Sequence, residues 1–150
     1  MLKIKFILTA LLIMFTANLG ANAATIGYAD FQKVLTDYKY ARNVFKDIDN
    51  KKMELHQYVI DKEKQLKNIE SPIQRKTFEE QIQKEFKARE EKIYNLKITK
   101  ETEIKDKVLA ASKAVATAKK LDVILDYGVV YAGGVDVTND IIQYLNAQKK

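Results

Sequence analysis

The 150-residue chain contains no cysteine and no tryptophan, and it has a single histidine. Without cysteine it cannot form a disulfide or use a thiolate as a nucleophile. It also lacks a glycine-rich phosphate loop, so the groupings of nucleophile, base and phosphate-binding backbone that mark many enzymes are missing. These absences predict a protein that is not an enzyme and that uses no cofactor.

The residues considered as metal ligands have simpler explanations. His56 lies beside Leu55 in a lysine-rich stretch, which is typical of a surface histidine. Asp122, Asp126 and Asp136 lie at expected strands and turns, where strand alternation, turn formation and helix entry account for aspartate without calcium. We therefore expect no metal site.

The amino terminus has the pattern of a secretory signal peptide. Lys3 and Lys5 precede an apolar stretch over residues 6–15, and Ala21-Asn22-Ala23 supplies the small residues of a cleavage site. The apolar stretch is shorter than the roughly 20 residues that a membrane-spanning helix needs. We therefore assign residues 1–23 to a cleaved signal peptide that directs export.

The exported chain has a modest excess of positive charge. Removing Lys3 and Lys5 lowers the basic count from 26 to 24 against 20 acidic residues, so the formal net charge falls from +6 to +4. Export argues against nucleic acid as a partner and leaves anionic lipid, lipopolysaccharide or acidic proteins. The alternative is a solvated surface of mixed charge, because glutamates alternate with the basic residues of the central region. These are Arg75, Lys76, Lys84, Lys87, Arg89 and Lys92.

Glycine and proline are scarce in the centre of the chain. Between Asp37 and Lys120 there is no glycine and only one proline, Pro72. Proline is tolerated in the first turn of a helix but not in its interior. The sequence therefore predicts two long helices joined by a hinge near residues 70–72, with Ser71 as the N-cap of the second helix.

This pattern divides the exported residues 24–150 into an arm and a body within one domain. The arm is an antiparallel helical hairpin over about residues 38–107. The body combines residues 24–37 with residues 108–150, so the two ends of the exported chain meet there.

Each predicted helix carries one apolar seam. Apolar residues recur at alternating spacings of three and four, which is typical of a helix that packs against a single partner helix. Lys52 and Lys62 interrupt the seam of the first helix, and a gap between Phe86 and Ile93 interrupts the second. The seam residues are Ala41, Val44, Ile48, Leu55, Val59, Leu66 and Ile69, followed by Phe78, Ile82, Phe86, Ile93 and Leu96.

Some seam residues are also candidates for contact with another protein. A two-helix arm cannot fully bury a broad apolar stripe, so part of the stripe stays available to bind an apolar segment of another protein, called a client below. The alternative is that these residues only pack against the opposite helix. The candidates are Val59, Leu66, Phe78, Ile82, Phe86 and Ile93.

The two ends of the exported chain predict three short strands. Residues 25–29, 121–125 and 129–131 are rich in β-branched and aromatic residues. Tyr127-Gly128 lies between the last two stretches and indicates a tight turn that joins them. Strands at both ends of a helical chain give an α+β fold.

The body is expected to need other copies of the chain. Three short strands bury too little area to offset the entropy of ordering them, so we expect assembly to complete the core. Asp30 and Thr138 are the expected N-caps of two small helices that pack on the strands. The residues expected in the oligomer core are Ile26, Tyr28, Val123, Leu125 and Val129.

Both ends of the exported chain resemble the Skp or OmpH-like family of periplasmic chaperones. A lysine- and glutamate-rich hairpin lies between the matching stretches, and the resemblance covers essentially the whole exported chain. The stretches are residues 26–35, 114–118, 121–126 and 136–138, followed by Ile141, Ile142, Leu145 and Asn146.

The resemblance implies a homotrimer in the periplasm, with a β body built from three chains and three helical arms around a cavity. Family members hold unfolded outer-membrane β-barrel proteins after export, without ATP, and prevent their aggregation before membrane insertion. The resemblance also implies a lipopolysaccharide site on basic arm residues, but no residue of this divergent arm can be matched to it.

A structural coiled-coil adaptor that scaffolds an envelope complex is the alternative function. Such an adaptor requires an uninterrupted seam. The lysines at positions 52 and 62 and the gap after Phe86 fit the wall of a cage better than a permanent zipper.

Overall fold

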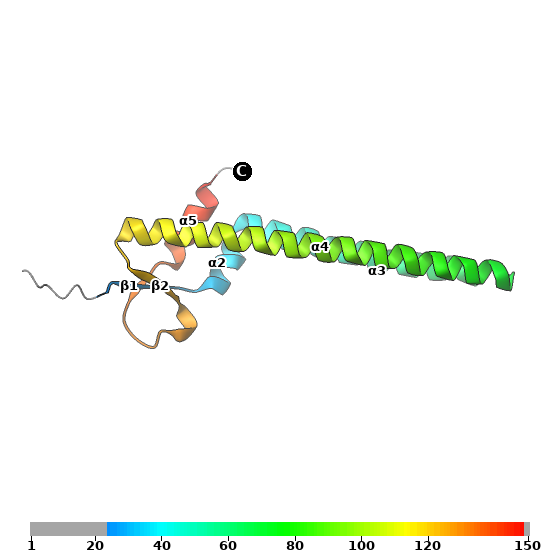
Figure 1. The fold of residues 1–150 in the computed structure, drawn as a ribbon, viewed down its shortest axis with the longest axis horizontal. Helices are drawn as coiled ribbons and strands as arrows, with labels where there is room; N and C mark the ends of the chain where they lie inside the picture. Colours follow the sequence, from blue (N-terminus) through cyan, green and yellow to red (C-terminus); the bar gives the residue numbers. More distant parts are fainter. Residues whose placement is uncertain (1–23, 149–150) are drawn as a thin grey trace, which may run out of the picture.

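The computed structural model describes residues 24–148 and shows a long arm extending from a small body (Figure 1). The predicted signal peptide, residues 1–23, lies outside the described residues. The chain is mainly helical with one three-stranded sheet, in agreement with the predicted α+β class. No helix within the described range is both long and apolar enough to cross a membrane. The elements are β1 (Ile26–Ala29), α2 (Phe31–Asp37), α3 (Lys39–Lys67), α4 (Pro72–Lys119), β2 (Val123–Asp126), the 3-10 helix η1 (Tyr127–Val129), β3 (Val135–Asp136) and α5 (Thr138–Ala147).

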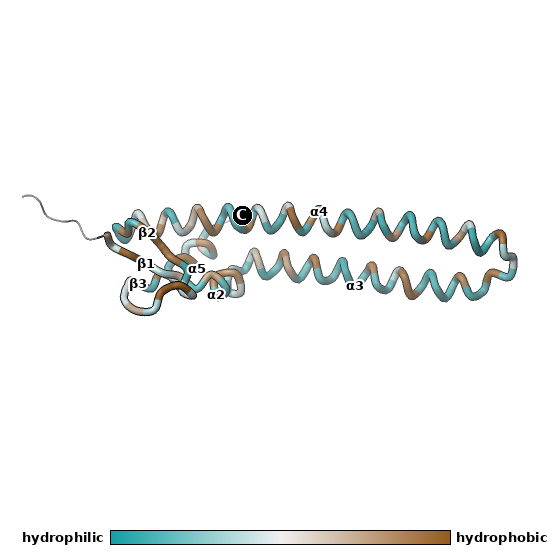
Figure 2. Tube along the Cα trace, turned by 60° about the horizontal axis from the view of Figure 1, so that its bottom comes forward, coloured by the Kyte–Doolittle hydropathy of each residue, from teal (hydrophilic) through white to brown (hydrophobic). Residues whose placement is uncertain are grey.

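The arm consists of α3 and α4, which lie side by side on either side of a turn at residues 68–71 (Figures 1 and 2). Pro72 is the first residue of α4, and Ser71 occupies the N-cap position. The Ser71 side chain makes no capping hydrogen bond, so the capping role predicted for its hydroxyl is wrong. Instead, the Arg75 guanidinium donates to the Ile69 carbonyl at 2.9 Å and ties the start of α4 to the turn.

The sheet of the body is parallel. β1 is the central strand and pairs with both β2 and β3. In this register Ile26 lies opposite Val123, and Gly27 lies opposite Val135. Both outer strands therefore have one edge that pairs with nothing in the described chain, because β1 occupies only their inner edges.

The strand predicted over residues 129–131 is wrong. The Asp126 carboxylate accepts a hydrogen bond of 2.8 Å from the N–H of Gly128, and this contact starts the 3-10 helix η1 instead of a hairpin turn. The chain then returns through Gly133 and Gly134, whose φ angles of 78° and 88° are readily adopted only by glycine. The loop thus carries the chain back across the sheet, so that β3 pairs parallel with β1.

The two faces of the sheet lie in different environments. Ile124 packs on the core of the chain, on the face where a side chain at Gly27 would collide with Leu121. On the opposite face Ile26 and Val123 are 40% and 38% exposed. Val123 therefore faces away from the core of its own chain, since side chains alternate along a strand and Ile124 takes the inner place.

The core of the body joins both ends of the chain to the root of the arm. α4 enters it through Ile104, Ala111 and Val115, which are buried. One chain thus buries a core of its own, because helices cover the inner face of the sheet, and the completion of this core by other copies stays a prediction. The buried apolar residues of this core are Ala29, Val34, Tyr38, Ala41, Ile104, Ala111, Val115, Leu121, Val137, Ile141 and Leu145.

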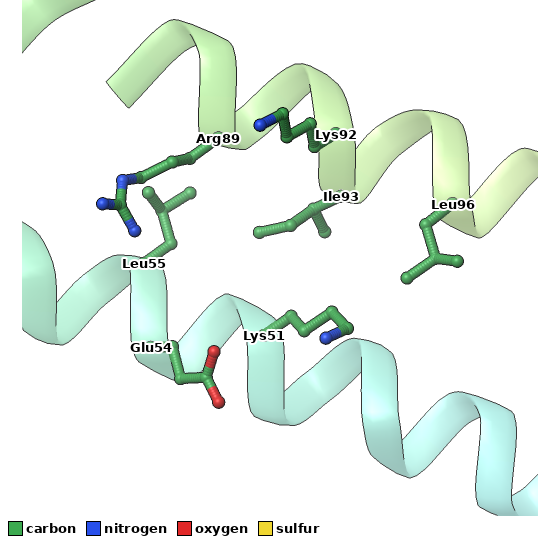
Figure 3. Close-up of a pocket in the computed structure, with 7 residues that line it drawn as sticks. All are labelled: Lys51, Glu54, Leu55, Arg89, Lys92, Ile93 and Leu96. Carbon is green, nitrogen blue, oxygen red and sulfur yellow. The ribbon is translucent and has the colours of Figure 1, made fainter. Parts of the chain in front are cut away.

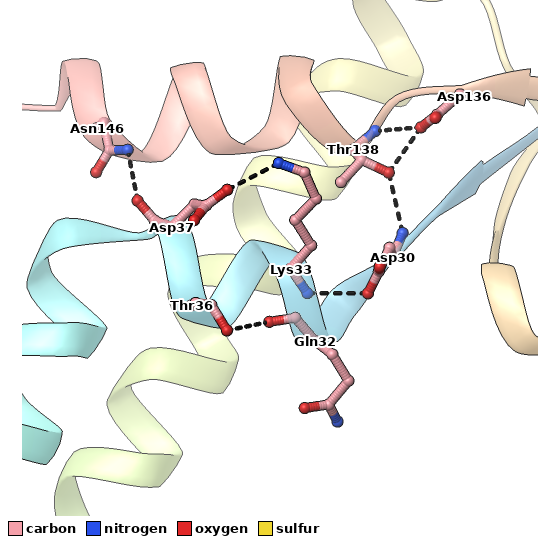
Figure 4. A network of polar contacts seen from close by, with 8 residues as sticks. All are labelled: Asp30, Gln32, Lys33, Thr36, Asp37, Asp136, Thr138 and Asn146. Carbon is pink, nitrogen blue, oxygen red and sulfur yellow. Dashed lines mark hydrogen bonds and ion pairs between the residues drawn. The ribbon is translucent and has the colours of Figure 1, made fainter.

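A polar network connects the starts of α2 and α5 (Figure 4). Asp30 caps α2 as predicted, because its carboxylate accepts from the N–H of Lys33 at 2.9 Å. Thr138 is the first residue of α5 and not its N-cap, which is Val137. The Thr138 hydroxyl accepts from the N–H of Asp30 at 3.0 Å and donates to Asp136 at 2.6 Å. Hydrogen bonds from Thr138 also hold the pKa of Asp136 below its usual value.

A second link bridges the break between α2 and α3. Tyr38 has an extended backbone, with φ of −72° and ψ of 106°, which separates the two helices. The Asn146 side chain of α5 donates to the Asp37 carbonyl at 3.1 Å (Figure 4) and accepts from the N–H of Lys39 at 2.9 Å. One amide thus satisfies the last carbonyl of α2 and the first N–H of α3, which have no partner within their own helices.

We predict that Asn146→Ala lowers the free energy of unfolding by about 1–3 kcal/mol, because two helix-terminal backbone groups lose their partner. Asn139→Ala is the matched control, since Asn139 is exposed on the same helix, and it should change stability by less than about 0.5 kcal/mol. Urea denaturation followed by circular dichroism measures both values. Equal stabilities of the two variants would contradict the role of Asn146.

Candidate functional site

The arm surface is the candidate functional site, and it is only partly closed. Over residues 49–103 no side chain is buried, whereas Ile48 and Ile104 on either side of this range are 3% and 2% exposed. Figure 2 shows hydrophilic colour predominating along both helices, with separate hydrophobic stretches between. A helix with a single neighbour can bury one narrow stripe, so the seam stays half exposed.

The six predicted client-binding residues all lie in this partly exposed seam. Each is intermediate in burial, neither enclosed in a core nor fully open to solvent. Packing between the helices and contact with a client are therefore both compatible with their positions. They are Val59, Leu66, Phe78, Ile82, Phe86 and Ile93.

A polar and aromatic cluster joins the helices in the middle of the arm. The Tyr58 hydroxyl donates to the Glu85 carboxylate at 2.8 Å, and the Arg89 guanidinium lies 4.3 Å from the centre of the Tyr58 ring. The Lys62 ammonium lies 5.6 Å from the Tyr58 ring and 5.4 Å from the Phe78 ring. Such cation–π contacts hold the helices together without burying apolar surface.

The electrostatics of this cluster follow from its hydrogen bonds. A hydrogen bond from Gln81, together with the one from Tyr58, holds the pKa of the Glu85 carboxyl below its usual value. Partial burial, with the hydrogen bond to Glu85, raises the pKa of the Tyr58 hydroxyl. Both shifts favour the ionised carboxylate and the neutral phenol that the hydrogen bond requires.

Two of the three interruptions predicted in the seam are therefore contacts between side chains and not gaps. Lys62 covers two aromatic rings, and the gap between Phe86 and Ile93 contains Arg89, which stacks on Tyr58. Lys52 does point away, and its ammonium lies 3.3 Å from the Asp49 carboxylate on the same helix. Sequence reasoning missed this cluster because apolar spacing does not include Tyr58, Glu85 or Arg89.

A second cluster of the same kind lies at the root of the arm. The Tyr40 hydroxyl donates to Glu103 at 2.8 Å and accepts from Lys100 at 3.0 Å, and the Lys107 ammonium lies 5.6 Å from the Tyr40 ring centre. The hydrogen bond from Lys100 lowers the pKa of Glu103, and the same bond raises the pKa of Lys100. The two clusters thus fasten α3 to α4 at two levels.

A cavity of about 280 Å³ lies between the helices, closer to the body than the middle cluster (Figure 3). Leu55 of α3 and Ile93 and Leu96 of α4 supply its apolar surface, while the charged residues Lys51, Glu54, Arg89 and Lys92 surround it. The helices are therefore not tightly packed here, and the apolar atoms of the seam remain accessible.

Several large apolar residues outside the seam are exposed, and sequence reasoning missed them. Tyr94, Ile98 and Leu109 of α4 are 62%, 45% and 51% exposed, and Met53 and Ile73 are 62% and 80% exposed. These residues lie outside the apolar spacing of the seam. The only sign of them in the sequence is therefore an apolar residue at a position that is expected to face solvent.

The predicted oligomer-core residues lie on or beside the outer face of the sheet. Ile26, Val123 and Val129 are exposed, and Tyr28 and Leu125 are half-buried. The Tyr28 ring contacts the ring of Tyr127 in the loop after β2, with centroids 5.9 Å apart. Ile26, Leu125 and Val129 also line a cavity of about 390 Å³ under this loop.

The aspartates considered for metal binding are engaged in local hydrogen bonds. Asp122 accepts from the N–H of Thr25 at 2.7 Å, Asp126 caps η1, and Asp136 binds Thr138. Across residues 24–148, no three His, Asp or Glu side chains are grouped to hold a metal ion. The arm offers a partly exposed apolar surface to which another molecule can bind.

Comparison with known families gives one match. The model of the family described as "Outer membrane protein (OmpH-like)" matches residues 25–145, which is most of the chain. The chain belongs to the OmpH-like family. The family match confirms the resemblance seen in the sequence. A search of curated proteins found no match to the chain.

Membership of the OmpH-like family supports a periplasmic, chaperone kind of function toward outer-membrane proteins. The matched range contains both ends of the body and the whole arm. The OmpH-like assignment therefore rests on the body as well as on the arm.

In this OmpH-like chain we predict that Tyr58→Phe loosens the arm, because the hydrogen bond to Glu85 is lost while the ring stays. Amides near Tyr58 should exchange about 2- to 10-fold faster, as expected for a bond worth about 0.5–1.5 kcal/mol. Tyr94→Phe is the matched control, since it removes a hydroxyl from an exposed ring on the same arm. Hydrogen exchange followed by mass spectrometry measures both, and identical rates would show that the cluster does not stabilise the arm.

Proposed function

We propose that this chain is an ATP-independent holdase of the periplasm that binds unfolded outer-membrane β-barrel proteins after export and prevents their aggregation before insertion. The observation that carries the proposal is that no side chain is buried over residues 49–103. An arm with a half-exposed seam can contact apolar segments of many sequences, yet it encloses no site for one ligand. Membership of the OmpH-like family supports the same function.

Binding in this proposal consists of many weak contacts along the arms. The seam candidates supply apolar surface, and the basic residues of the chain supply long-range attraction. With +4 for each exported chain, three copies carry about +12, which steers acidic clients toward the arms and is screened by salt. Anionic lipid or lipopolysaccharide is a further partner compatible with this charge, and nucleic acid is not expected after export.

We also propose that three chains assemble through the outer face of the sheet. Ile26 and Val123 are exposed on this face, and Val129 and Tyr131 are 65% and 104% exposed beside it. Apolar residues gathered in this way favour a covered interface, and the unpaired edges of the outer strands favour pairing with another chain. The number three comes from the family resemblance.

The alternative of a coiled-coil adaptor receives less support. An adaptor needs a closed apolar zipper between its helices. The contacts that join α3 to α4 in the middle of the arm include charged side chains on aromatic rings, and the seam residues there are half exposed. These features fit a surface that exchanges partners.

We predict that residues 24–150, purified without ATP, keep a urea-denatured porin from aggregating on dilution. A variant in which a short glycine-containing turn replaces residues 53–93 keeps the buried core of the body but should lose most of this suppression. Light scattering measures aggregation, and circular dichroism checks that the shortened variant is folded. If the folded, assembled short variant suppresses aggregation as well as the intact protein, residues 53–93 of the arm are not the binding surface.

We predict that Val123→Asp converts the trimer to monomers without unfolding the chain. Val123 is 38% exposed within one chain, so the carboxylate stays solvated there, but an unpaired charge at a closed interface costs several kcal/mol. Asn139→Asp adds the same charge in the first turn of α5, where an acid is favourable, and should leave the trimer intact. Analytical ultracentrifugation at micromolar concentration distinguishes trimer from monomer. A wild-type protein that is folded and monomeric would contradict the proposed trimer.

A further inference from the structure

The outer surface of α4 carries apolar residues that the seam does not use. Tyr94 and Ile98 are 62% and 45% exposed and lie four residues apart, so they are neighbours on one side of the helix. Glu101 and Lys105 continue this side at spacings of three and four, and Leu109, which is 51% exposed, follows Lys105 by four. These five residues form a continuous track that runs toward the body.

The track leads into a groove at the root of the arm, where α2, α3 and α4 meet. The groove has a volume of about 330 Å³, and Phe31 and Leu35 of α2, Phe45 of α3 and Val108 of α4 are among its lining residues. Glu101 and Lys105 of the track also line it, so track and groove are one surface. We call this surface the root groove.

The charges at the root groove are not balanced within the chain. The Glu101 carboxylate lies 3.7 Å from the Lys97 ammonium and is already paired. Lys105 has no carboxylate within ion-pair distance among residues 24–148, and neither has Lys113, one turn beyond Leu109. An apolar groove with two unpaired cations nearby favours a partner that is both apolar and acidic.

We propose that the root groove binds an extended client segment in which apolar residues alternate along the chain and acidic residues lie close by. This inference rests on the proposed holdase function and adds the place on the arm and the chemistry of the segment. It also assigns client contact to Tyr94, Ile98 and Leu109, in addition to the seam residues.

The spacing of the root groove suits such a segment. Side chains on one side of an extended chain recur about every 6.4–6.8 Å, and residues i and i+4 of a helix lie about 6 Å apart along the axis. Alternate apolar side chains can therefore contact Tyr94 and then Ile98, and a side chain further along the segment can enter the groove beside Val108. Lys105 and Lys113 then attract carboxylates of the same segment.

A second copy of the chain is a less suitable occupant. The exposed apolar residues assigned above to the interface between copies lie on the sheet, at Ile26 and Val123, whereas the root groove is formed entirely by helices.

The absence of cysteine in the chain allows the occupant to be identified directly with single introduced thiols.

The first test is site-specific crosslinking. Ile98→Cys and Leu109→Cys, labelled with a benzophenone maleimide, should crosslink to a urea-unfolded, cysteine-free porin several-fold more than Asn50→Cys, an exposed position on α3. Equal crosslinking at all three sites would overturn the proposal. Crosslinks between copies of this chain in the absence of porin would also overturn it, since a second copy would then cover the groove.

The second test is client affinity. Ile98→Ser with Leu109→Ser should raise the Kd for the unfolded porin about 5- to 20-fold, since roughly half of each side chain is still available for burial. Met53→Ser with Ile73→Ser makes the same change at exposed arm residues outside both the seam and the groove, and should raise the Kd by less than the groove variant does. All four residues are at least 45% exposed, so both variants should fold. Equal losses in the two variants, or no loss in the first, would overturn the proposal.

A peptide comparison tests the chemistry. A synthetic peptide of alternating valine and aspartate should bind the wild-type protein about tenfold more tightly than one of alternating valine and lysine at low salt, and the difference should shrink at 0.5 M salt. Equal binding of both peptides would overturn the acidic preference. If the wild-type protein does not retain the porin at all, the proposed holdase function is contradicted. If the wild-type protein retains the porin and the groove variants retain it equally well, only the inference about the root groove is contradicted.

Discussion

Over residues 49–103 each helix of the arm packs only against the other, and most features of the molecule follow from this constraint. A helix in a globular core is covered on several sides, but α3 and α4 can cover only the stripe that they share. The seam between them is therefore half exposed over residues 49–103, and charged side chains complete it. Tyr58 with Arg89 and Tyr40 with Lys107 are contacts that tolerate water on one side, which purely apolar packing does not.

The body holds one end of the arm in place. α4 passes from the arm into the core without a break, and its buried residues Ile104, Ala111 and Val115 contact elements from both ends of the chain. α3 is attached through a non-helical residue, Tyr38, and through the Asn146 side chain across the break. Both helices of the arm thus pack in the core, α3 through Ala41, but α3 also needs side-chain hydrogen bonds across the break at its start.

Sequence reasoning identified the elements whose signals are local. The absence of glycine, together with the position of Pro72, located both long helices, because a proline at the first helical position is one of the few places it fits. Asp30 was correctly identified as a cap, since its partner lies three residues away. These predictions needed no knowledge of which segments meet in space.

The errors concern choices that depend on distant contacts. Residues 129–131 have the composition of a strand, but the segment that pairs with β1 is β3. Nothing in the local sequence indicates whether the chain after β2 forms a hairpin or crosses the sheet to pair in parallel. Thr138 has the character of a cap, yet it serves as a bridge between Asp30 and Asp136. The clusters around Tyr58 and Tyr40 were missed because each needs the register between two helices, which spacing within one helix does not give.

The pairing of β1 with β2 sets the order in which the chain can fold. Thr25 exchanges hydrogen bonds with Asp122, 97 residues later, so the sheet cannot start to form until almost the entire sequence is present. Contacts of such long sequence separation are slow to form unless intervening structure brings the ends together. The arm does so, because two helices joined by a short turn return the chain close to its starting point. We therefore expect the arm, although it is the segment with the weakest packing, to form before the sheet of the body closes.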